Sequence, residues 1–225
     1  MDGQECKMQL LIFGPPGAGK GTQAVRIAQA MEIPHVSTGD LFRANMRDGT
    51  ELGKKAQEYV TGGELVPNEI VIAMALDRIG QADCQKGFLL DGFPRDVEQA
   101  EQLEKWLLER GKNITAVLSV ELDDETIIQR IISRRVCRSC GATYNVSAQP
   151  PKVENVCDQC GGPVVQRPDD QREVIENRLS VYKKQTAPVE EFYRKRGVLK
   201  TISGDGDMDS VFGRIQEVLS DFERS

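Results

Sequence analysis

Short runs of apolar residues alternate along the chain with longer stretches in which apolar and polar positions follow helical periodicity. Four runs have the length of buried strands: residues 8–13, 88–91, 114–122 and 197–203. The first run leads through a glycine-rich stretch into the helical pattern of residues 22–31, which predicts a strand, a loop and a helix in succession. Strands that alternate with helices predict a parallel sheet covered by helices on both faces.

Two segments interrupt this alternation. Residues 37–66 have a helical pattern with no strand candidate and end in the turn-rich sequence TGGELVPN. Residues 133–170 are poor in helix-forming residues and rich in Gly, Pro and Cys. We interpret both segments as insertions into a single α/β core, which leaves three ranges for that core: residues 1–36, 67–132 and 171–225.

Composition narrows the class of protein. A chain of 225 residues can bury a hydrophobic core of its own. A net charge of −6 and an aromatic content of 5% argue against a nucleic-acid partner, because phosphate backbones are bound by clustered Lys and Arg. Acidic residues precede the first apolar run, so we expect neither a signal peptide nor a membrane anchor, and we expect a cytoplasmic protein without a membrane partner.

The sequence GPPGAGKGTQ, residues 14–23, has the pattern of a phosphate-binding loop. Gly14, Gly17 and Gly19 allow backbone amides to turn towards an anion, and the helix that follows adds its positive N-terminal end. Lys20 supplies a point charge for the β and γ phosphates. Most such loops place Ser or Thr after the lysine as a magnesium ligand, whereas this chain has Gly21.

Four of the six cysteines form two Cys-x-x-Cys pairs separated by sixteen residues: Cys137, Cys140, Cys157 and Cys160. This spacing is typical of a four-thiolate metal site, and a closed thiolate shell indicates a structural ion. Zinc is the expected metal, but tetrahedral sulfur ligation also accepts iron or cobalt. Disulfides and free thiols are the alternatives. We expect Cys6 and Cys84 not to be ligands.

The loop sequence GPPGAGKGT resembles that of adenylate kinases, in which the lysine is followed by Gly-Thr, and further family motifs cover nearly the whole chain. They are STGDLFR, GELVPNEI, GFLLDGFPRDVEQA, RRVC and DDQREVIENRL, at residues 37–43, 63–70, 87–100, 134–137 and 169–179. The resemblance implies a three-layer α/β P-loop fold with a five-stranded parallel sheet, a helical insertion that binds the nucleoside monophosphate, and a zinc-bearing lid. It also implies reversible transfer of a phosphoryl group from MgATP to AMP, giving two ADP. In that family magnesium is held mainly by phosphate oxygens and water, which accounts for Gly21.

The resemblance assigns the site residues. For ATP they are Gly14, Pro15, Gly17, Ala18, Gly19, Lys20, Gly21, Thr22, Arg130 and Arg134. For AMP they are Thr38, Gly39, Arg43, Val66, Gly92, Arg95, Gln99, Arg167 and Arg178. The catalytic group comprises Lys20, Arg95, Arg134, Arg167 and Arg178, and Asp91 is expected to hold magnesium through water.

Some of these assignments have support from the residues themselves. Arginine suits a site that joins two anionic phosphates, because it stays charged and can bind two oxygens at once. Helical spacing puts Arg178 on an apolar face, although its charged head could instead reach water, and it puts Arg130 and Arg134 on one helix face. Asp91 ends an apolar strand, where α/β sheets carry ligand groups; capping of the strand end is the alternative.

Gln99 has two competing interpretations. Gln99 is either the reader of the adenine edge or, with Asp96, part of a capping box that starts a helix. His35 is expected to be structural. As a whole, the chain is expected to be a monomeric kinase with ATP, AMP and ADP as partners. A UMP/CMP kinase and a zinc-ribbon nucleic-acid-binding ATPase are the alternatives.

Overall fold

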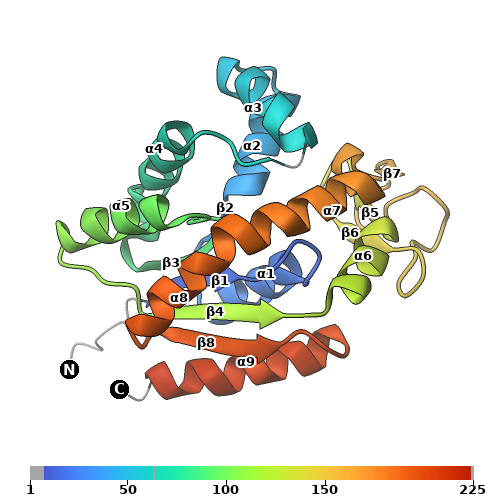
Figure 1. Ribbon diagram of the computed structural model, residues 1–225. Helices are drawn as coiled ribbons and strands as arrows, with labels where there is room; N and C mark the ends of the chain where they lie inside the picture. The colour runs from blue at the N-terminus through green and yellow to red at the C-terminus, as the bar shows by residue number, and fades with distance from the viewer. Residues whose placement is uncertain (1–7, 63, 224–225) are drawn as a thin grey trace.

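The computed structural model describes residues 8–62 and 64–223, and its centre is a five-stranded parallel sheet with the strand order β2-β3-β1-β4-β8 (Figure 1). The strands are β1 (Met8–Phe13), β2 (His35–Ser37), β3 (Gly87–Asp91), β4 (Ala116–Glu121) and β8 (Leu199–Ser203). All four neighbouring pairs in this order are parallel, as the alternation of strands and helices predicts. The predicted fold class is confirmed.

Four of the five strands coincide with the predicted apolar runs, to within two residues at either end. The fifth, β2, has only three residues, and Val36 is its one buried apolar side chain. A strand this short has no apolar run for periodicity to detect. β2 forms because Val36 pairs with Leu90 at the open edge of β3.

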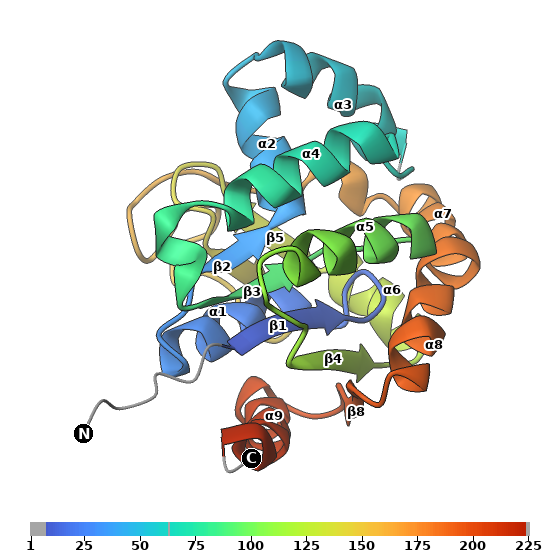
Figure 2. The same cartoon turned by 90° about the vertical axis from the view of Figure 1, so that its left-hand side faces the viewer.

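Helices cover both faces of the sheet, and alternate residues of β1 show how the two layers form (Figure 2). Leu10 and Ile12 pack with α1 (Lys20–Ala30) and α9 (Met208–Glu223) on one face. Leu11 and Phe13 pack on the other face with α4 (Asn68–Ile79), α5 (Val97–Leu108) and α8 (Ala187–Lys195). This period of two is the pattern expected of a strand that is buried on both sides.

The segment between β2 and α4 forms two packed helices, α2 (Thr38–Arg47) and α3 (Glu51–Gly62), which project beyond the sheet (Figure 1). Gly53 allows this packing, because a Cβ at that position would lie 2.2 Å from the carbonyl oxygen of Asn45. The side chain of Asn177 joins the segment to α7 (Arg172–Val181), donating to the carbonyl of Gly62 at 2.9 Å and to Glu64 at 3.0 Å.

The cysteine-rich segment follows α6 (Asp124–Ile132) and forms a separate antiparallel sheet. Its strands are β5 (Arg134–Cys137), β6 (Thr143–Asn145) and β7 (Val164–Val165), in the order β6-β5-β7. One prediction is wrong here: Arg134 does not share a helix face with Arg130. The helix ends at Ile132, and Ser133 caps it. Arg134 is the first residue of β5 and pairs with Asn145 of β6.

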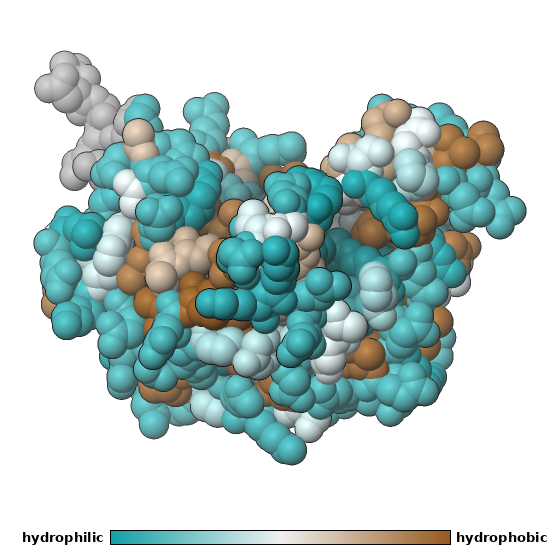
Figure 3. Space-filling view, turned by 90° about the horizontal axis from the view of Figure 1, so that it is seen from above, coloured by the Kyte–Doolittle hydropathy of each residue, from teal (hydrophilic) through white to brown (hydrophobic). Residues whose placement is uncertain are grey.

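The remaining elements are short. Ala82–Gln85 and Pro168–Asp170 are single 3₁₀ turns, and Tyr182–Thr186 is a π-helical turn that joins α7 to α8. Seen from above, the surface is largely hydrophilic with scattered apolar residues (Figure 3). Within residues 8–62 and 64–223, no helix combines the length and the apolar character needed to cross a membrane.

Candidate active site and metal centre

The loop between β1 and α1 has the geometry of an anion site. Gly14 has a φ of 138°, and a Cβ there would lie 2.3 Å from the carbonyl oxygen of Val120, so only glycine fits this close approach to β4. Gly19 is the N-cap of α1; no side chain caps this end and the first turn carries no acidic residue. The amides at the start of α1 therefore remain available to a phosphate.

Lys20 lies at the start of α1, and its ammonium group donates a hydrogen bond to the carbonyl oxygen of Pro15 at 2.7 Å. Burial lowers the pKa of Lys20 to about 8. The negative charge of Asp91 opposes this shift, whereas the positive charges of Arg95, Arg178 and Arg134 reinforce it. The lysine thus lies in a concentration of positive charge that an anionic ligand would relieve.

The predicted arginines come together around this lysine although they lie on separate parts of the chain. Burial and the charge of Arg178 lower the pKa of Arg95, and burial and the charge of Arg43 lower that of Arg167. Burial also lowers the pKa of Arg178. Neighbouring cations repel one another, so this cluster costs stability unless anions occupy it. The arrangement suits two phosphate-bearing substrates brought close together.

Three of these arginines are held by carboxylates. Arg43 donates to Asp40 from Nε at 3.2 Å, and burial of that carboxyl is outweighed by Arg43, so the pKa of Asp40 is lowered. Two other acidic residues lie next to each other in the 3₁₀ turn: Asp170 accepts from Arg134, and Asp169 accepts from Arg178 at 2.7 Å. The head of Arg178 is therefore anchored by Asp169, although about a quarter of its side chain is still exposed to solvent.

Arg130, predicted to contact ATP, donates from Nη2 to the carbonyls of Gly204 and Gly206, at 3.3 and 3.5 Å, and its contact with ATP stays a prediction. These carbonyls belong to the loop that follows β8. In this conformation Arg130 therefore orders that loop.

The predicted AMP side is assembled at the end of β3. The hydroxyl of Thr38 donates to the carbonyl of Gly92 at 2.9 Å, and a Cβ on Gly92 would lie 2.9 Å from Thr38 Oγ1 and 3.1 Å from Arg95 Nη2. Thr38 and Val66 are both buried. At Gly39, a Cβ would lie 3.1 Å from Arg43 Nη2. The threonine, the glycines and two arginines thus form one continuous group.

Asp91 is the last residue of β3, and its carboxylate lies near both the phosphate loop and His35. A Cβ on Gly21 would lie 3.8 Å from Asp91 Oδ2, so the position that usually carries the hydroxyl is indeed next to this carboxylate. His35 Nε2 lies 3.5 Å from the same oxygen. A carboxylate at this place suits magnesium held through water, and magnesium would neutralise phosphate charge there.

Gln99 has the capping interaction that its sequence context predicts. Asp96 is the N-cap of α5 and accepts from the backbone amide of Gln99 at 2.8 Å. The side chain of Gln99 reaches back to the amide of Arg95, also at 2.8 Å, one residue before the position that a capping box uses. Its capping role does not exclude a role in binding.

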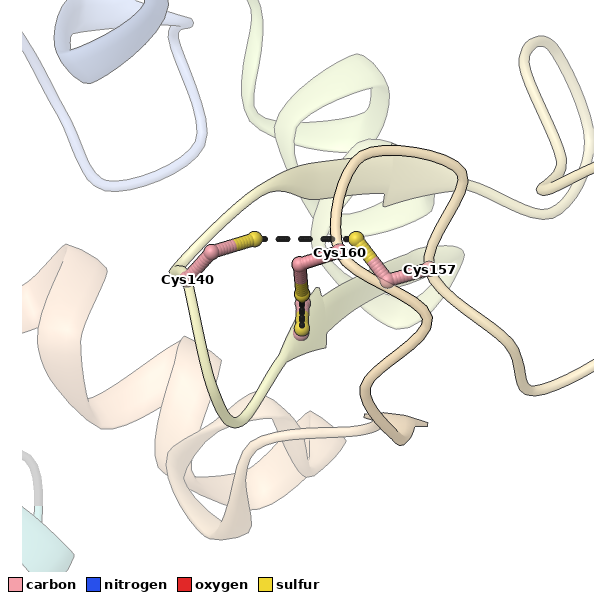
Figure 4. Close-up of side chains that lie close together, drawn as sticks. Cys140, Cys157 and Cys160 are labelled. Atoms are coloured by element: carbon pink, nitrogen blue, oxygen red, sulfur yellow. Dashed lines mark hydrogen bonds between the residues drawn. The ribbon is translucent and has the colours of Figure 1, made fainter.

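The four predicted cysteines come together at the base of the antiparallel sheet, with all their Sγ atoms within 4.8 Å of one another. Cys137 and Cys160 are 3.5 Å apart at their sulfurs, and Cys140 and Cys157 are 3.6 Å apart (Figure 4). A tetrahedral zinc site with Zn–S bonds of about 2.3 Å has sulfurs about 3.8 Å apart, whereas a disulfide needs about 2.05 Å. The cluster therefore fits a four-thiolate ion and contains no disulfide.

The two halves of this cluster have the same backbone geometry. The amides of Gly141 and Gly161 donate to the carbonyls of Cys137 and Cys157, at 3.0 and 2.9 Å, and both glycines have positive φ. Tyr144 lies behind the sulfurs, with its hydroxyl 3.3 Å from Cys157 Sγ. The hydrogen bond from Tyr144 lowers the pKa of Cys157 to about 6, which favours the thiolate at this one cysteine. At Cys160 a backbone hydrogen bond from Gly162 lowers the pKa, but the contacts with the thiols of Cys140 and Cys137 outweigh it and raise the pKa.

Sequence reasoning missed three groups of residues that the structure brings to this site. His35 lies against Asp91, Asp169 and Asp170 hold two of the arginines, and Asn68 contacts Gln99. The motif containing the two aspartates was recognised, but no local signal indicates which arginine each one binds. Cys84 is buried and lies away from the cysteine cluster, whereas Cys6 is outside the described residues.

Together, the phosphate loop, the cluster of arginines and the strand-end carboxylate define a P-loop phosphotransferase. A family model described as adenylate kinase matches residues 12–198. The chain belongs to the adenylate kinase family and is a nucleoside monophosphate kinase, and nothing in the comparisons favours the two alternatives.

Individual relatives agree over almost the full length of the chain. A protein named adenylate kinase from Carboxydothermus hydrogenoformans is 55% identical over 212 residues, covering 94% of this chain and 99% of the relative. Proteins of the same name from Caldanaerobacter subterraneus and Clostridioides difficile are 52% and 49% identical, each over 94% of this chain and over 96% and 98% of their own lengths.

Proposed function

We propose that the protein catalyses reversible transfer of the γ-phosphoryl group of MgATP to AMP, giving two ADP. The observation that carries this proposal is a cluster of positive charge from several parts of the chain: Arg95, Arg134 and Arg178 act on Lys20, and Arg43 and Arg167 act on these arginines and on each other. Such a concentration of charge suits a reaction between two anions, for which positioning and electrostatic stabilisation matter more than a general base.

In this proposal each side of the cluster has its own task. The amides of the phosphate loop and Lys20 hold the phosphates of ATP, while Arg43 and Arg95 hold the phosphate of AMP. Arg134, Arg167 and Arg178 neutralise the group in transfer. Thr38, Val66, Gly92 and Gln99 enclose the base of AMP. Magnesium, when bound near Asp91, offsets the charge of the ATP phosphates.

The cysteine-rich segment acts as a lid whose fold depends on one structural metal ion, which we propose to be zinc. Residues 133–170 form this lid, residues 37–66 form the AMP-binding insertion, and the remaining ranges form the core. The lid closes over ATP and excludes water, so that AMP is phosphorylated instead of ATP being hydrolysed. We further propose that the protein works as a monomer in the cytoplasm, where a reducing environment would keep the four cysteines available as metal ligands.

The test of this function is a coupled assay of ADP formation with AMP, CMP, UMP and GMP as acceptors. AMP should be the preferred acceptor. The Lys20→Met variant should keep its fold and lose about 10² to 10³ in kcat, because one charge contact in a site without water contributes that much. Near-normal activity of folded Lys20→Met, or equal use of the pyrimidine nucleotides, would refute the proposal.

A further inference from the structure

The side-chain amide of Gln99 is buried and is held by three hydrogen bonds. Its exposed fraction is 1%. Oε1 accepts from the backbone amide of Arg95 at 2.8 Å, while Nε2 donates to Asn68 Oδ1 at 2.7 Å and to Asp96 Oδ2 at 3.3 Å. The contact with Asn68 joins the N-terminus of α4 to that of α5.

A chain of hydrogen bonds fixes which way this amide points. At one end, the backbone N–H of Arg95 can only donate. At the other end, the carboxylate of Glu98 can only accept, and it accepts from Asn68 Nδ2 at 2.7 Å. Asn68 must therefore turn Oδ1 towards Gln99, and Gln99 must donate to it from Nε2. Flipping either amide would bring donor against donor or acceptor against acceptor.

The fixed amide has one kind of hydrogen-bonding capacity left. Both hydrogens on Nε2 are used, by Asn68 and Asp96, whereas Oε1 accepts one hydrogen bond and keeps a second lone pair. At position 6 of the base, a 6-amino purine offers an N–H donor to the free lone pair of Gln99 Oε1. A 6-oxo purine offers an acceptor at the same position, so that two acceptors face each other. A pocket with a fixed acceptor rejects the 6-oxo base, since two acceptors then face each other unpaired.

We propose that Asn68 is a specificity-determining positioning residue, which fixes the amide of Gln99 so that the site takes a 6-amino purine nucleoside monophosphate and rejects a 6-oxo one. The inference rests on the proposed function, in which Gln99 faces the base of AMP. Asn68 itself acts through Gln99. Its place next to Val66 and Pro67 brings it to the pocket from the segment opposite α5.

The experiment measures KM and kcat for AMP and for IMP, together with equilibrium binding of each nucleotide without ATP. In Asn68→Ala, KM for AMP should rise about tenfold with little change in kcat, the loss expected for one hydrogen bond. KM for IMP should stay the same or fall, because an amide held by Arg95 and Asp96 alone is ordered less firmly and can move away from the 6-oxo group. The AMP to IMP preference should shrink accordingly.

Three further variants make the result specific. The double variant Asn68→Asp with Glu98→Gln keeps an acceptor opposite Nε2 and a donor opposite residue 68, and it should retain the preference for AMP. Glu98→Ala removes the far end of the hydrogen-bond chain and should give part of the loss, whereas Glu101→Ala, an exposed change on the same helix, should behave as the wild type. If Asn68→Ala lowers Tm but keeps the wild-type preference, Asn68 is only structural and the inference fails.

The two proposals can fail separately. A wild-type protein that does not prefer AMP over CMP and UMP would overturn the proposed function itself. A wild type that selects AMP, with an Asn68→Ala variant that rejects IMP equally well, would leave the function in place and overturn only the role of Asn68.

Discussion

The guanidinium of Arg134 binds the carboxylate of Asp170, a side chain with no exposure to solvent, through both Nε and Nη2. This pair joins the first strand of the cysteine-rich sheet to the turn that leads back to the core. A buried charge that loses its partner is costly, so this contact sets both stability and the position of Arg134.

Asp170→Asn should therefore destabilise the protein by about 1.5 to 3 kcal/mol, the range for hydrogen bonds to charged groups. It should also lower kcat, because Arg134 is no longer held in position. Denaturant unfolding and steady-state kinetics measure the two effects. Glu176→Gln is the matched control, since its pair with Arg172 is about half exposed on both sides and should contribute little. Equal unfolding free energies for the two variants would contradict this expectation.

The pKa of Lys20 predicts a pH dependence of ATP binding. The ammonium group of the free enzyme is charged below pH of about 8 and loses its proton above it. The affinity for MgATP should consequently fall as the pH rises through this value. Stability runs in the opposite direction: burying the charge costs stability at low pH, and this cost disappears as the pH rises towards 10.5.

Calorimetric titration of MgATP between pH 6.5 and about 9.5 tests this, because ATP phosphates are already ionised over most of that range. Lys20→Arg keeps its charge throughout and should bind with an affinity that does not depend on pH in the alkaline range. An alkaline decrease of the same size in both proteins would show that another group is responsible.

Cys157→Ser should lower both metal content and Tm. The lid has a very small apolar cluster, formed by Cys137, Tyr144, Cys157 and Val164, so ligation must replace hydrophobic burial there. Activity at low temperature should fall only as far as Arg134 and Arg167 lose their positions. Elemental analysis beside a thermal melt measures this and distinguishes zinc from iron and cobalt. A metal-free wild type with an unchanged melt would defeat the proposed structural role.

Gly162→Ala should weaken metal retention for a steric reason. A Cβ there would lie 2.4 Å from Ser139 Oγ and 3.1 Å from Cys137 Sγ, which forces the two cysteine turns apart. Adding Ser139→Gly removes the closer contact and should recover much of the loss. The rate of metal release to a colorimetric chelator measures the effect in both variants. Failure of the second change to recover retention would place the strain elsewhere.

Sequence patterns were sufficient for most of the architecture because long apolar runs and glycine spacing are local properties. Periodicity found β1, β3, β4 and β8 but not β2, since three residues with one buried side chain give no periodic signal. It also continued α6 through Arg134, where pairing with Asn145 overrides helical spacing. Long-range partners decide such cases.

In the site, too, the residues found by local spacing could be predicted, whereas their long-range partners could not. The four cysteines and the phosphate loop follow from spacing alone. In the structure the four cysteines form one cluster, and Lys20 contacts Pro15 within the phosphate loop. Which carboxylate holds Arg134, and which amide holds Gln99, depends on contacts between segments 36 and 31 residues apart. The assigned roles of the arginines, the domain boundaries, the oligomeric state and the location in the cell stay predictions.

The strand order also determines when the central sheet can be completed during synthesis on the ribosome. β8 is the last strand to be made, and it pairs with β4 from Val117 opposite Leu199 to Glu121 opposite Ser203. Until residue 203 has left the exit tunnel, β4 presents an open edge, the kind of surface that invites pairing with other chains. The last of the four cysteines, Cys160, is made before β8 begins at Leu199, so the nascent protein could bind a metal ion while its central sheet still needs protection from aggregation.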